Sequence, residues 1–420
     1  MLSQLKNNHY FLRNMSWMAV AEILIRVTRI VATIVLARYL SQQDYGVAAI
    51  ALAVAEFIRV LTNNGIGIKI INSSAKDLDR NCNIVYRLNW LISSLIFVVQ
   101  VLMAPVAAFY YGINDLSLLL IALAFPYIVY PFAMVHVYLA QRTNDLKLTG
   151  LMLGGIVGLD NLVSAVLVLL GFEVWSVVLP KLIVAPIWVA IYRQKVDWMP
   201  SKTVRWRAAF SFFSFGKTIF LTEFLKVLRH NVDVIIIAKV LGLELAGLYA
   251  FAKNAGLGIS LSLINALNTA LLPKLCAVSN KEVASEFRKG IKLATITVLP
   301  LIAVQAALAS MYVPLLFGDK WSHATSLVTL LCLSAIPRTL VDAFSPLMRV
   351  LEQQNLELRI ATQFSFLYIV GCLLSAHFGL MFVASFIGLA YALFAIIIYV
   401  FVLKKVSRFT RYEEVTYVVP

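Results

Sequence analysis

Two stretches of the sequence carry ionisable side chains at helical spacing inside apolar segments. In the first, Glu22, Arg26 and Arg29 follow one another at intervals of four and three residues, which places them on one face of a helix. The second holds five ionisable residues within eleven positions: Glu223, Lys226, Arg229, His230 and Asp233. A charge at the centre of a membrane helix costs roughly 2.5–3.5 kcal/mol on insertion scales, so such residues normally face a bundle interior or a water-filled cavity. Both stretches are therefore candidate sites for ligand binding and ion coupling.

The two charged stretches are copies of one sequence pattern. A shift of 201 residues aligns Glu22 with Glu223 and also aligns Gly46 with Gly247. If each half contains six spans, both copies enter the membrane in the same direction. Parallel repeats of this kind are related by a pseudo-two-fold axis along the membrane normal, and the substrate path is expected between the halves.

The composition indicates a membrane protein with many spans. The chain is 61% hydrophobic and 14% charged, its mean hydropathy is +0.86, and the apolar residues are spread along its whole length. Segments of about 20 residues, enough to cross about 30 Å of hydrocarbon, lie near 15–40, 45–68, 88–110, 116–140, 148–171, 174–194, 210–239, 245–272, 292–312, 324–350, 358–376 and 380–403. We therefore expect an all-α fold of twelve transmembrane helices, arranged as an N-terminal six-helix bundle (1–200), a C-terminal six-helix bundle (201–404) and a cytoplasmic tail (405–420).

Lysine and arginine residues predict the orientation of the chain. They crowd alternate connections and both termini, whereas the opposite face carries only Arg38, Lys239 and Lys320. Because basic residues near span ends are retained on the cytoplasmic side, both termini are expected in the cytoplasm. The net charge of +15 then reports topology and contact with anionic headgroups rather than nucleic-acid binding. The four cysteines lack metal-ligand spacing, so we assign no disulfide, metal or cofactor.

Other spans hold polar groups whose role the sequence leaves open. Glu56 and Arg59 stand at i and i+3, as a pair that either only fixes helix packing or takes part in function. Asp160 is either a proton site or a hydrogen-bonding partner of a neighbouring helix. Further cations in apolar spans are Lys181, Lys253 and Arg338, the last with Asp342 one turn away.

Proline and glycine patterns predict local helix geometry. Pro126 and Pro131, each flanked by aromatic residues, predict a kinked fourth span, which suits a lateral opening, sugar stacking or a static packed kink. Gly150, Gly154 and Gly158 have the small-xxx-small spacing that lets two membrane helices approach closely.

The ends of the first and seventh spans carry short motifs. The first span closes on Ala37-Arg38, Leu40 and Asp44-Tyr45-Gly46. Its echo in the second half comprises Asp233, Leu241-Gly242, Ala246-Gly247-Leu248-Tyr249 and Leu272-Pro273-Lys274. With these motifs and its six-plus-six layout, nearly the whole chain resembles the polysaccharide repeat-unit flippases of the O-antigen type, within the multidrug/oligosaccharidyl-lipid/polysaccharide exporter superfamily.

The resemblance implies a MATE-like fold and a place in the bacterial cytoplasmic (inner) membrane. Such proteins move undecaprenyl-pyrophosphate-linked oligosaccharides from the cytoplasmic to the periplasmic leaflet by alternating access, commonly coupled to proton or sodium entry, in the synthesis of O-antigen and lipopolysaccharide. The implied partners are the lipid-linked oligosaccharide, membrane lipid, and the polysaccharide polymerase and chain-length machinery. The implied role is transport rather than catalysis.

Cations outnumber carboxylates in these spans, which favours an anionic ligand, and pyrophosphate is a natural one because guanidinium and ammonium groups make strong charge-assisted hydrogen bonds with phosphate oxygens. We assign binding of the pyrophosphate or sugar to Arg26, Arg29, Arg59, Lys181, Lys226, Arg229, Lys253 and Arg338. We assign ion coupling to Glu22, Glu56, Asp160, Glu223 and Asp233. Glu223 fits coupling best, because Lys226 lies one turn away and a movable cation changes the proton affinity of a carboxylate.

Three rival functions remain to be tested. A multidrug or organic-ion exporter of the same superfamily handles cations, so it needs an acidic lumen. A membrane glycosyltransferase or polymerase needs catalytic groups on a sizeable outer loop, and the predicted outer loops are short. A transporter of the major facilitator type also has two six-span halves, but it usually carries a longer central loop.

Overall fold

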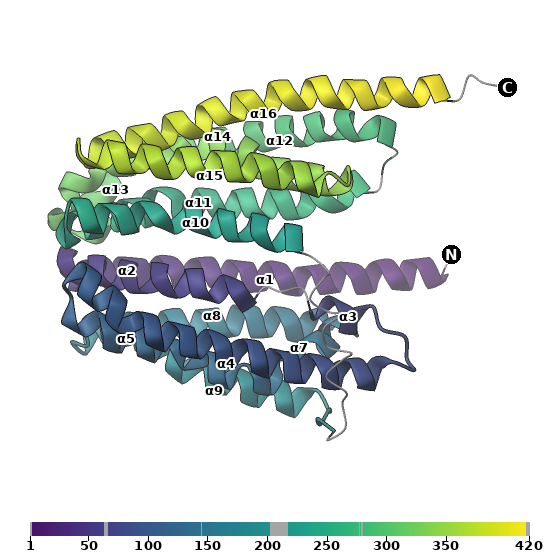
Figure 1. Ribbon diagram of the computed structural model, residues 1–420, viewed down its shortest axis with the longest axis horizontal. Coiled ribbons are helices and arrows are strands. Elements are labelled where there is room, and N and C mark those ends of the chain that lie inside the picture. The colour runs from purple at the N-terminus through teal and green to yellow at the C-terminus, as the bar shows by residue number, and fades with distance from the viewer. Residues whose placement is uncertain are drawn as a thin grey trace. The chain divides into compact units, whose positions relative to one another are not determined.

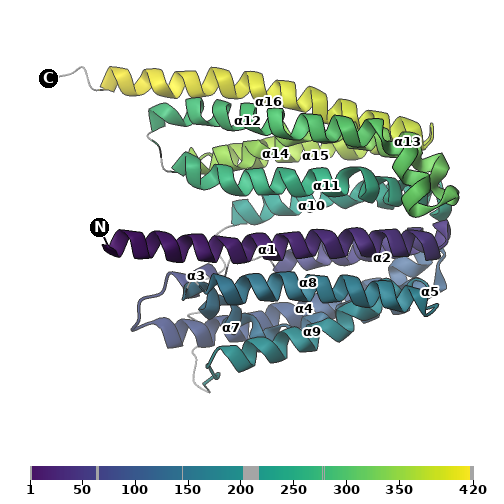
Figure 2. The same ribbon diagram turned by 180° about the vertical axis from the view of Figure 1, so that it is seen from behind.

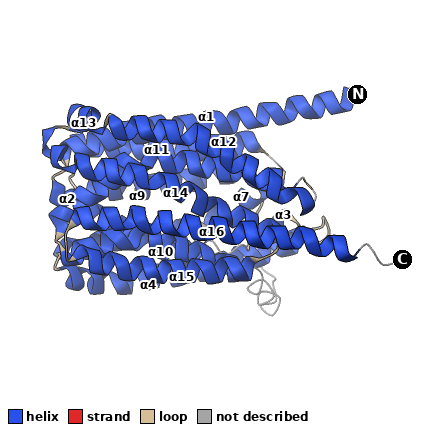
Figure 3. Cartoon of the chain, turned by 90° about the horizontal axis from the view of Figure 1, so that it is seen from above, coloured by secondary structure: helices blue, strands red, loops and turns tan. Residues whose placement is uncertain are grey.

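A computed structural model describes residues 2–62, 66–143, 145–201, 217–276, 278 and 280–416. These residues form helices joined by short loops, and none of them lies in a β-strand (Figure 3). The chain divides into two compact units, the first ending at Phe220 and the second beginning at Leu221. Each unit is described by itself.

The first unit is a bundle of nine α-helices and one short 3-10 helix, η1 (Val60–Thr62), in the described residues, drawn from purple to teal in Figure 1. The α-helices are α1 (Leu2–Tyr39), α2 (Gln42–Arg59), α3 (Ile68–Ile71), α4 (Leu78–Tyr111), α5 (Asn114–Ala124), α6 (Pro126–Val129), α7 (Pro131–Arg142), α8 (Leu146–Leu169) and α9 (Trp175–Lys195). α1 runs along α8, α8 along α9 and α4 along α5 (Figures 1 and 2).

Proline and glycine shape this unit as the sequence predicts. The segment from α5 to α7 breaks before Pro126 and Pro131, and Asn114–Val129 meets Pro131–Arg142 at a bend of 54°. On α8, a Cβ atom built on Gly154 would lie 2.8 Å from the Cα atom of Ala21 on α1. Only glycine therefore permits this close approach of the two helices.

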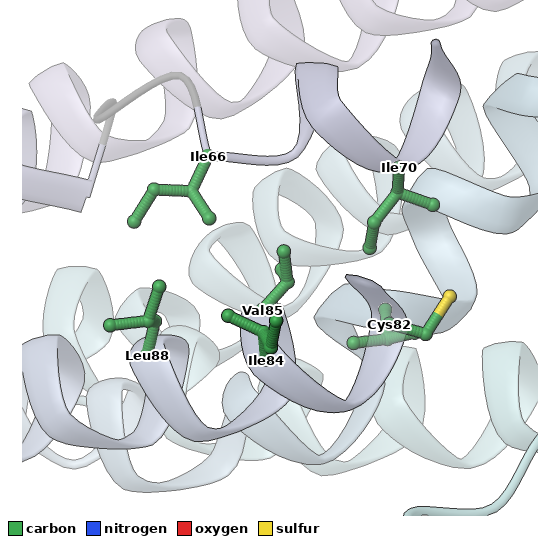
Figure 4. Close-up of a cluster of buried hydrophobic side chains, with 7 residues drawn as sticks. Ile66, Ile70, Cys82, Ile84, Val85 and Leu88 are labelled. Atoms are coloured by element: carbon green, nitrogen blue, oxygen red, sulfur yellow. The ribbon is translucent and has the colours of Figure 1, made fainter. Parts of the chain in front are cut away.

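The short helix α3 is held by apolar packing and by one arginine. Arg142, at the end of α7, donates hydrogen bonds from Nη1 to the backbone oxygens of Ile70 (3.0 Å) and Ile71 (2.9 Å) at the end of α3. These bonds satisfy carbonyl groups that a helix end leaves unpaired. Beneath α3, a cluster of buried side chains joins it to α4 and α7, consisting of Ile66, Ile70, Cys82, Ile84, Val85, Leu88 and Val135 (Figure 4).

The second unit is also helical in its described residues, drawn from teal to yellow in Figure 1. Its elements are α10 (Lys217–Val240), α11 (Leu243–Cys276), α12 (Asn280–Ala307), α13 (Ala309–Tyr312), the short helices η4 (Val313–Phe317) and η5 (Asp319–Ala324), α14 (Thr325–Val350), α15 (Gln354–Ala376) and α16 (Leu380–Thr416). α14 is central, because it packs against α11, α12 and α16, while α15 packs mainly against α16. A Cβ on Gly256 of α11 would lie 2.8 Å from the backbone oxygen of Val328 on α14.

Every predicted span overlaps a helix or a run of helices. Within the described residues, eight helices are long and apolar enough to cross a membrane, or nine when the bent pair over 114–142 counts as one span. α1, α10 and α11 are not among them, and the apolar stretches of α1 and α10 are interrupted by four or more charged side chains. The chain is a multi-pass membrane protein, and twelve crossings stay a prediction.

Candidate functional site

The charged face of α1 carries one ion pair and a third charged residue outside that pair. Arg26 donates from Nε to Oε1 of Glu22 over 3.0 Å, and both side chains are partly exposed. The spacing-based prediction of this pair is confirmed. Arg29 is exposed, and among the described residues no side-chain partner is recorded for its guanidinium group.

A polar contact joins α1 to α8 just beyond this pair. Asn161 Nδ2 donates to Oγ1 of the buried Thr28 over 3.1 Å. The Thr28 hydroxyl in turn donates to the backbone oxygen of Leu24 over 2.8 Å. The contact fixes the register of two helices that the glycine on α8 brings together.

Two further ion pairs of the first unit include predicted site residues. On α2, Arg59 donates from Nε to Oε2 of Glu56 over 2.8 Å and contacts Oε1 with Nη2, and 56% of the Arg59 side chain is exposed. Across α8 and α9, Lys181 Nζ lies 3.0 Å from Oδ2 of Asp160. Asp160 thus pairs with a residue of a neighbouring helix, which is one of the two roles that the sequence left open.

The kinked segment places aromatic rings beside α9. Tyr130, at the break before α7, has its ring 5.2 Å from that of Trp188, which lies 5.1 Å from the ring of Tyr192. These edge-on contacts pack the kinked segment against α9. Stacking on a sugar stays a prediction.

The second unit buries its central acid. Asp233 on α10 is 1% exposed and accepts hydrogen bonds from Lys253 Nζ at 2.8 Å and from the Tyr249 hydroxyl at 2.7 Å, both on α11. The hydroxyl of Tyr368, on α15, lies 3.4 Å from the same carboxylate oxygen. Asp233 therefore ties three helices together, and Lys253, which sequence reasoning assigned to substrate, lies on this buried carboxylate.

Two arginines of the second unit are also engaged internally. Arg229 is buried and donates from Nη1 to Ser365 Oγ (2.7 Å) and to the backbone oxygen of Ala361 (3.2 Å), both on α15. Arg338 Nε lies 3.3 Å from Oδ2 of Asp342, one turn along α14. The 201-residue shift aligns Arg229 with Thr28, so both units have a hydrogen bond between the first and the fifth major helix at equivalent places, donated by Asn161 of α8 in the first unit and by Arg229 of α10 in the second.

A third group of charges lies where α14 turns into α15. We call it the turn cluster: Glu223 and Lys226 from α10, Ser345 and Arg349 from α14, and Glu357 from α15. Glu223 accepts from Lys226 Nζ over 3.1 Å and is contacted by Nη2 of Arg349. Glu357 is 3% exposed, contacts the Ser345 hydroxyl, and lies 3.7 Å from Arg349 Nη2 and 4.0 Å from Lys226 Nζ.

The predicted partnership of Glu223 with Lys226 is therefore confirmed, but sequence reasoning missed Arg349 and Glu357. The signal for Arg349 was present, since it continues the helical stripe begun by Arg338 and Asp342 on the same span. Glu357 lies just before the predicted span 358–376. The structure places it in the first turn of a helix that begins at Gln354.

Comparison with known proteins adds to this geometry. The family described as polysaccharide biosynthesis protein matches residues 35–326, more than half of the chain. The chain belongs to this family. A relative among polysaccharide biosynthesis proteins is the teichuronic acid biosynthesis protein TuaB of Bacillus subtilis (strain 168), which is 24% identical over 336 residues, covering 78% of this chain and 68% of TuaB.

The fold of this chain is similar to the folds of solved transporter structures. An inward-facing multidrug resistance MATE family transporter of the MOP superfamily matches with a TM-score of 0.72 and 14% identity, over 93% of this chain and 96% of that one. The lipid II flippase MurJ, in an inward closed conformation, matches with a TM-score of 0.75 and 13% identity, over 92% of this chain and 87% of MurJ. The predicted all-α, MATE-like fold class is confirmed.

Proposed function

We propose that this polysaccharide biosynthesis protein is a flippase that moves undecaprenyl-pyrophosphate-linked oligosaccharide repeat units across the cytoplasmic membrane by alternating access. Three observations together support the proposal. The family is one of polysaccharide biosynthesis proteins. The fold is similar to those of a multidrug transporter and of a lipid II flippase. Membrane helices of this chain carry cations outside buried ion pairs. A polysaccharide pathway needs such a step because a charged, sugar-bearing headgroup does not cross hydrocarbon unaided.

The cations differ in how free they are to meet a pyrophosphate. Arg29 is exposed and Arg59 is more than half exposed in a pair on its own helix. Lys253 and Arg229 are buried and bonded to other helices. An exposed arginine can donate two hydrogen bonds to phosphate oxygens without leaving a buried carboxylate unpaired. We therefore assign pyrophosphate binding first to Arg29 and then to Arg59 and Arg26.

Transport in this proposal is driven by entry of protons or sodium ions, with Glu223 and its neighbours as the coupling groups. The position of Glu223 supports its role as a coupling group. It shares two cations, Lys226 and Arg349, with Glu357, and each cation could move between the two carboxylates. The protein would lie in the bacterial inner membrane with both termini in the cytoplasm, working beside the polymerase and chain-length machinery. Multidrug export is disfavoured by the excess of cations over acids in the apolar spans.

A leaflet assay in cells tests the proposal. Deleting the gene should make lipid-linked repeat units accumulate on the cytoplasmic side of the membrane, and the wild-type gene should restore export. Accumulation of shortened or incomplete repeat units instead would point to a glycosyltransferase. Unchanged polysaccharide with raised drug sensitivity would point to an exporter.

A further inference from the structure

Two ion pairs of the first unit stand within apolar spans and are only partly buried. On α2, the side chains of Arg59 and Glu56 are 56% and 34% exposed. Lys181 of α9 and Asp160 of α8 are 32% and 23% exposed. A charge that faces lipid is costly, so a partly exposed pair in a membrane helix is expected to face a water-filled space inside the bundle. Each pair is electrically balanced, and its carboxylate has more lone-pair sites than the partner cation occupies.

The kinked segment from α5 to α7 lies between the two pairs. On one side, the Tyr127 hydroxyl donates to the backbone oxygen of Ala55 on α2 over 3.4 Å, next to Glu56. On the other side, the ring of Tyr130 packs edge-on against Trp188 of α9, 5.2 Å away. Trp188 lies seven residues after the lysine of the second pair, which is two turns along the same face of α9. The kink therefore brings Tyr130 between α2 and α9.

The hydroxyl group of Tyr130 lies close to both pairs. It interacts electrostatically with Arg59 on α2 and with Asp160 on α8. Tyr130 is partly exposed, and among the described residues no hydrogen-bond partner is recorded for its hydroxyl. Tyr127, one turn earlier, is 4% exposed and uses its hydroxyl on Ala55. Of these two phenols, Tyr130 is thus the one that can bind a ligand without giving up an internal hydrogen bond.

The second unit lacks the α2 pair at the equivalent positions. The 201-residue shift aligns Glu56 with Leu257 and Arg59 with Ser260 on α11, and both of these residues are buried. A pair that served only the packing common to the two repeats would be expected in both copies. The polar group of the first unit is therefore better explained by a ligand that this unit binds.

The chemistry of this group is suited to a neutral sugar ring. Carboxylates accept hydrogen bonds from sugar hydroxyl groups, and a phenol can donate to them or accept from them. A phosphate group is bound by cations in excess of carboxylates, whereas cations and carboxylates are equal in number here. The balance of charge therefore favours an uncharged ligand that carries hydroxyl groups.

We propose that Glu56, Tyr130 and Asp160 form a subsite for the sugar that is joined to the pyrophosphate, a neutral ring whose hydroxyl groups they bind. The proposal rests on the proposed function and names the part of the substrate that this group of residues binds. Arg59, assigned above to the pyrophosphate, belongs to the same group. Because the first sugar is bonded directly to the pyrophosphate, the two subsites must be adjacent, as they are in this unit.

Binding of two lipids to the purified protein in lipid nanodiscs tests the subsite. One is the lipid-linked repeat unit extracted from the cells that make the polysaccharide, and the other is bare polyprenyl pyrophosphate. Each competes with a fluorescent polyprenyl pyrophosphate, and the wild-type protein should bind the glycosylated lipid more tightly. Tyr130→Phe keeps the ring against Trp188 and removes one hydroxyl group. It should weaken binding of the glycosylated lipid about threefold to tenfold and leave binding of the bare lipid unchanged.

Tyr127→Phe is the matched control, because it removes the same hydroxyl group from a buried neighbour, and it should not change the preference for the glycosylated lipid. Asp160→Asn and Glu56→Gln should each reduce this preference by about tenfold, since a carboxylate accepts a stronger hydrogen bond than an amide. A preference in folded Tyr130→Phe equal to that of the wild type would overturn the subsite. Equal losses for the two lipids would place these residues on the pyrophosphate and would overturn it as well.

The wild-type protein separates this proposal from the proposed function. If it binds both lipids with the same affinity, a lipid pyrophosphate is still a ligand of the protein, and only the sugar subsite is wrong. If the folded protein binds neither lipid, the proposed function fails and the subsite fails with it.

Discussion

The two units use charged residues in different ways. In the first, the pairs Glu22 with Arg26 and Glu56 with Arg59 each lie on a single helix and are partly exposed. In the second, Asp233 bonds to residues on α11 and lies near Tyr368 of α15, and it is 1% exposed. Under the 201-residue shift, Asp233 and Lys253 align with Ala32 and Leu52, so the first unit has apolar residues where the second has its buried pair.

This difference separates charges that hold the fold from charges that can meet a ligand. An exposed pair contributes about 0–1 kcal/mol, so a ligand can replace one partner at little cost. A buried pair cannot give up one member without stranding the other, which costs about 3–5 kcal/mol. We therefore expect substrate contacts mainly in the first unit, and helix locking and ion coupling in the second.

The largest expected effect is on the buried pair. Asp233→Leu and Lys253→Met should each lower the free energy of unfolding by about 3–5 kcal/mol, because each leaves a buried charge unpaired, whereas the double variant should recover most of the loss. Thermal unfolding of the protein in detergent measures this. Arg59→Gln in the first unit serves as the control and should stay within about 1 kcal/mol of wild type. If the two single variants kept wild-type stability, the buried pair would be no more important to stability than the exposed pairs, and the contrast between the units would be wrong.

The two arginines near the middle of the repeat should behave differently. Arg229→Ala should destabilise the protein by about 1.5–3 kcal/mol, since it removes charge-assisted hydrogen bonds to Ser365 and Ala361. Arg29→Ala should leave stability unchanged and abolish export, and Arg29→Lys should keep part of it because the charge remains. Export and membrane abundance measured together separate these outcomes. Full export by Arg29→Ala would rule out its substrate role.

Close helix contacts can be tested with matched glycine variants in each unit. Gly154→Ala and Gly256→Ala place a methyl group against backbone atoms, so each should cost about 1–3 kcal/mol in stability. Their controls are Gly155→Ala and Gly258→Ala, where the added Cβ meets open space and should be neutral or slightly stabilising. Equal effects at all four positions would show that helix propensity, not close approach, decides.

A small change in stability, with a selective effect on transport, is expected for Glu223→Gln. The amide keeps the shape of the side chain but weakens its bonds to Lys226 and Arg349, leaving Glu357 to compete for them. Substrate binding should persist, and stimulation by a pH gradient in vesicles should fall. If the variant shows unchanged dependence on the gradient, Glu223 is only a structural partner of the two cations.

Pairs within one helix could be predicted from the sequence, and pairs between helices could not. Spacing along a helix fixes which side chains share a face, so Glu22 with Arg26 and Glu56 with Arg59 followed directly. The partners of Asp160 and Asp233 depend on which helices touch, and spacing along one helix carries no information on that. Sequence reasoning therefore left Lys181 and Lys253 as substrate cations, while the structure pairs both with carboxylates.

The helical fold class and the proline kink were also readable from the sequence, because apolar run length and the missing proline N–H act locally. Helix ends were less accessible. A boundary error of a few residues at the start of α15 hid Glu357 and with it the turn cluster.

The central claim is that the protein moves lipid-linked oligosaccharide between leaflets. Its most direct test is reconstitution of the purified protein into vesicles that contain a fluorescent oligosaccharide linked through pyrophosphate to a polyprenyl lipid, with a membrane-impermeant quencher outside. The account predicts that wild-type protein exposes the inner-leaflet lipid to the quencher and that Arg29→Ala does not, although it is equally abundant and folded. Quenching that stops at the outer-leaflet fraction with the wild-type protein, under both pH and sodium gradients, would contradict it.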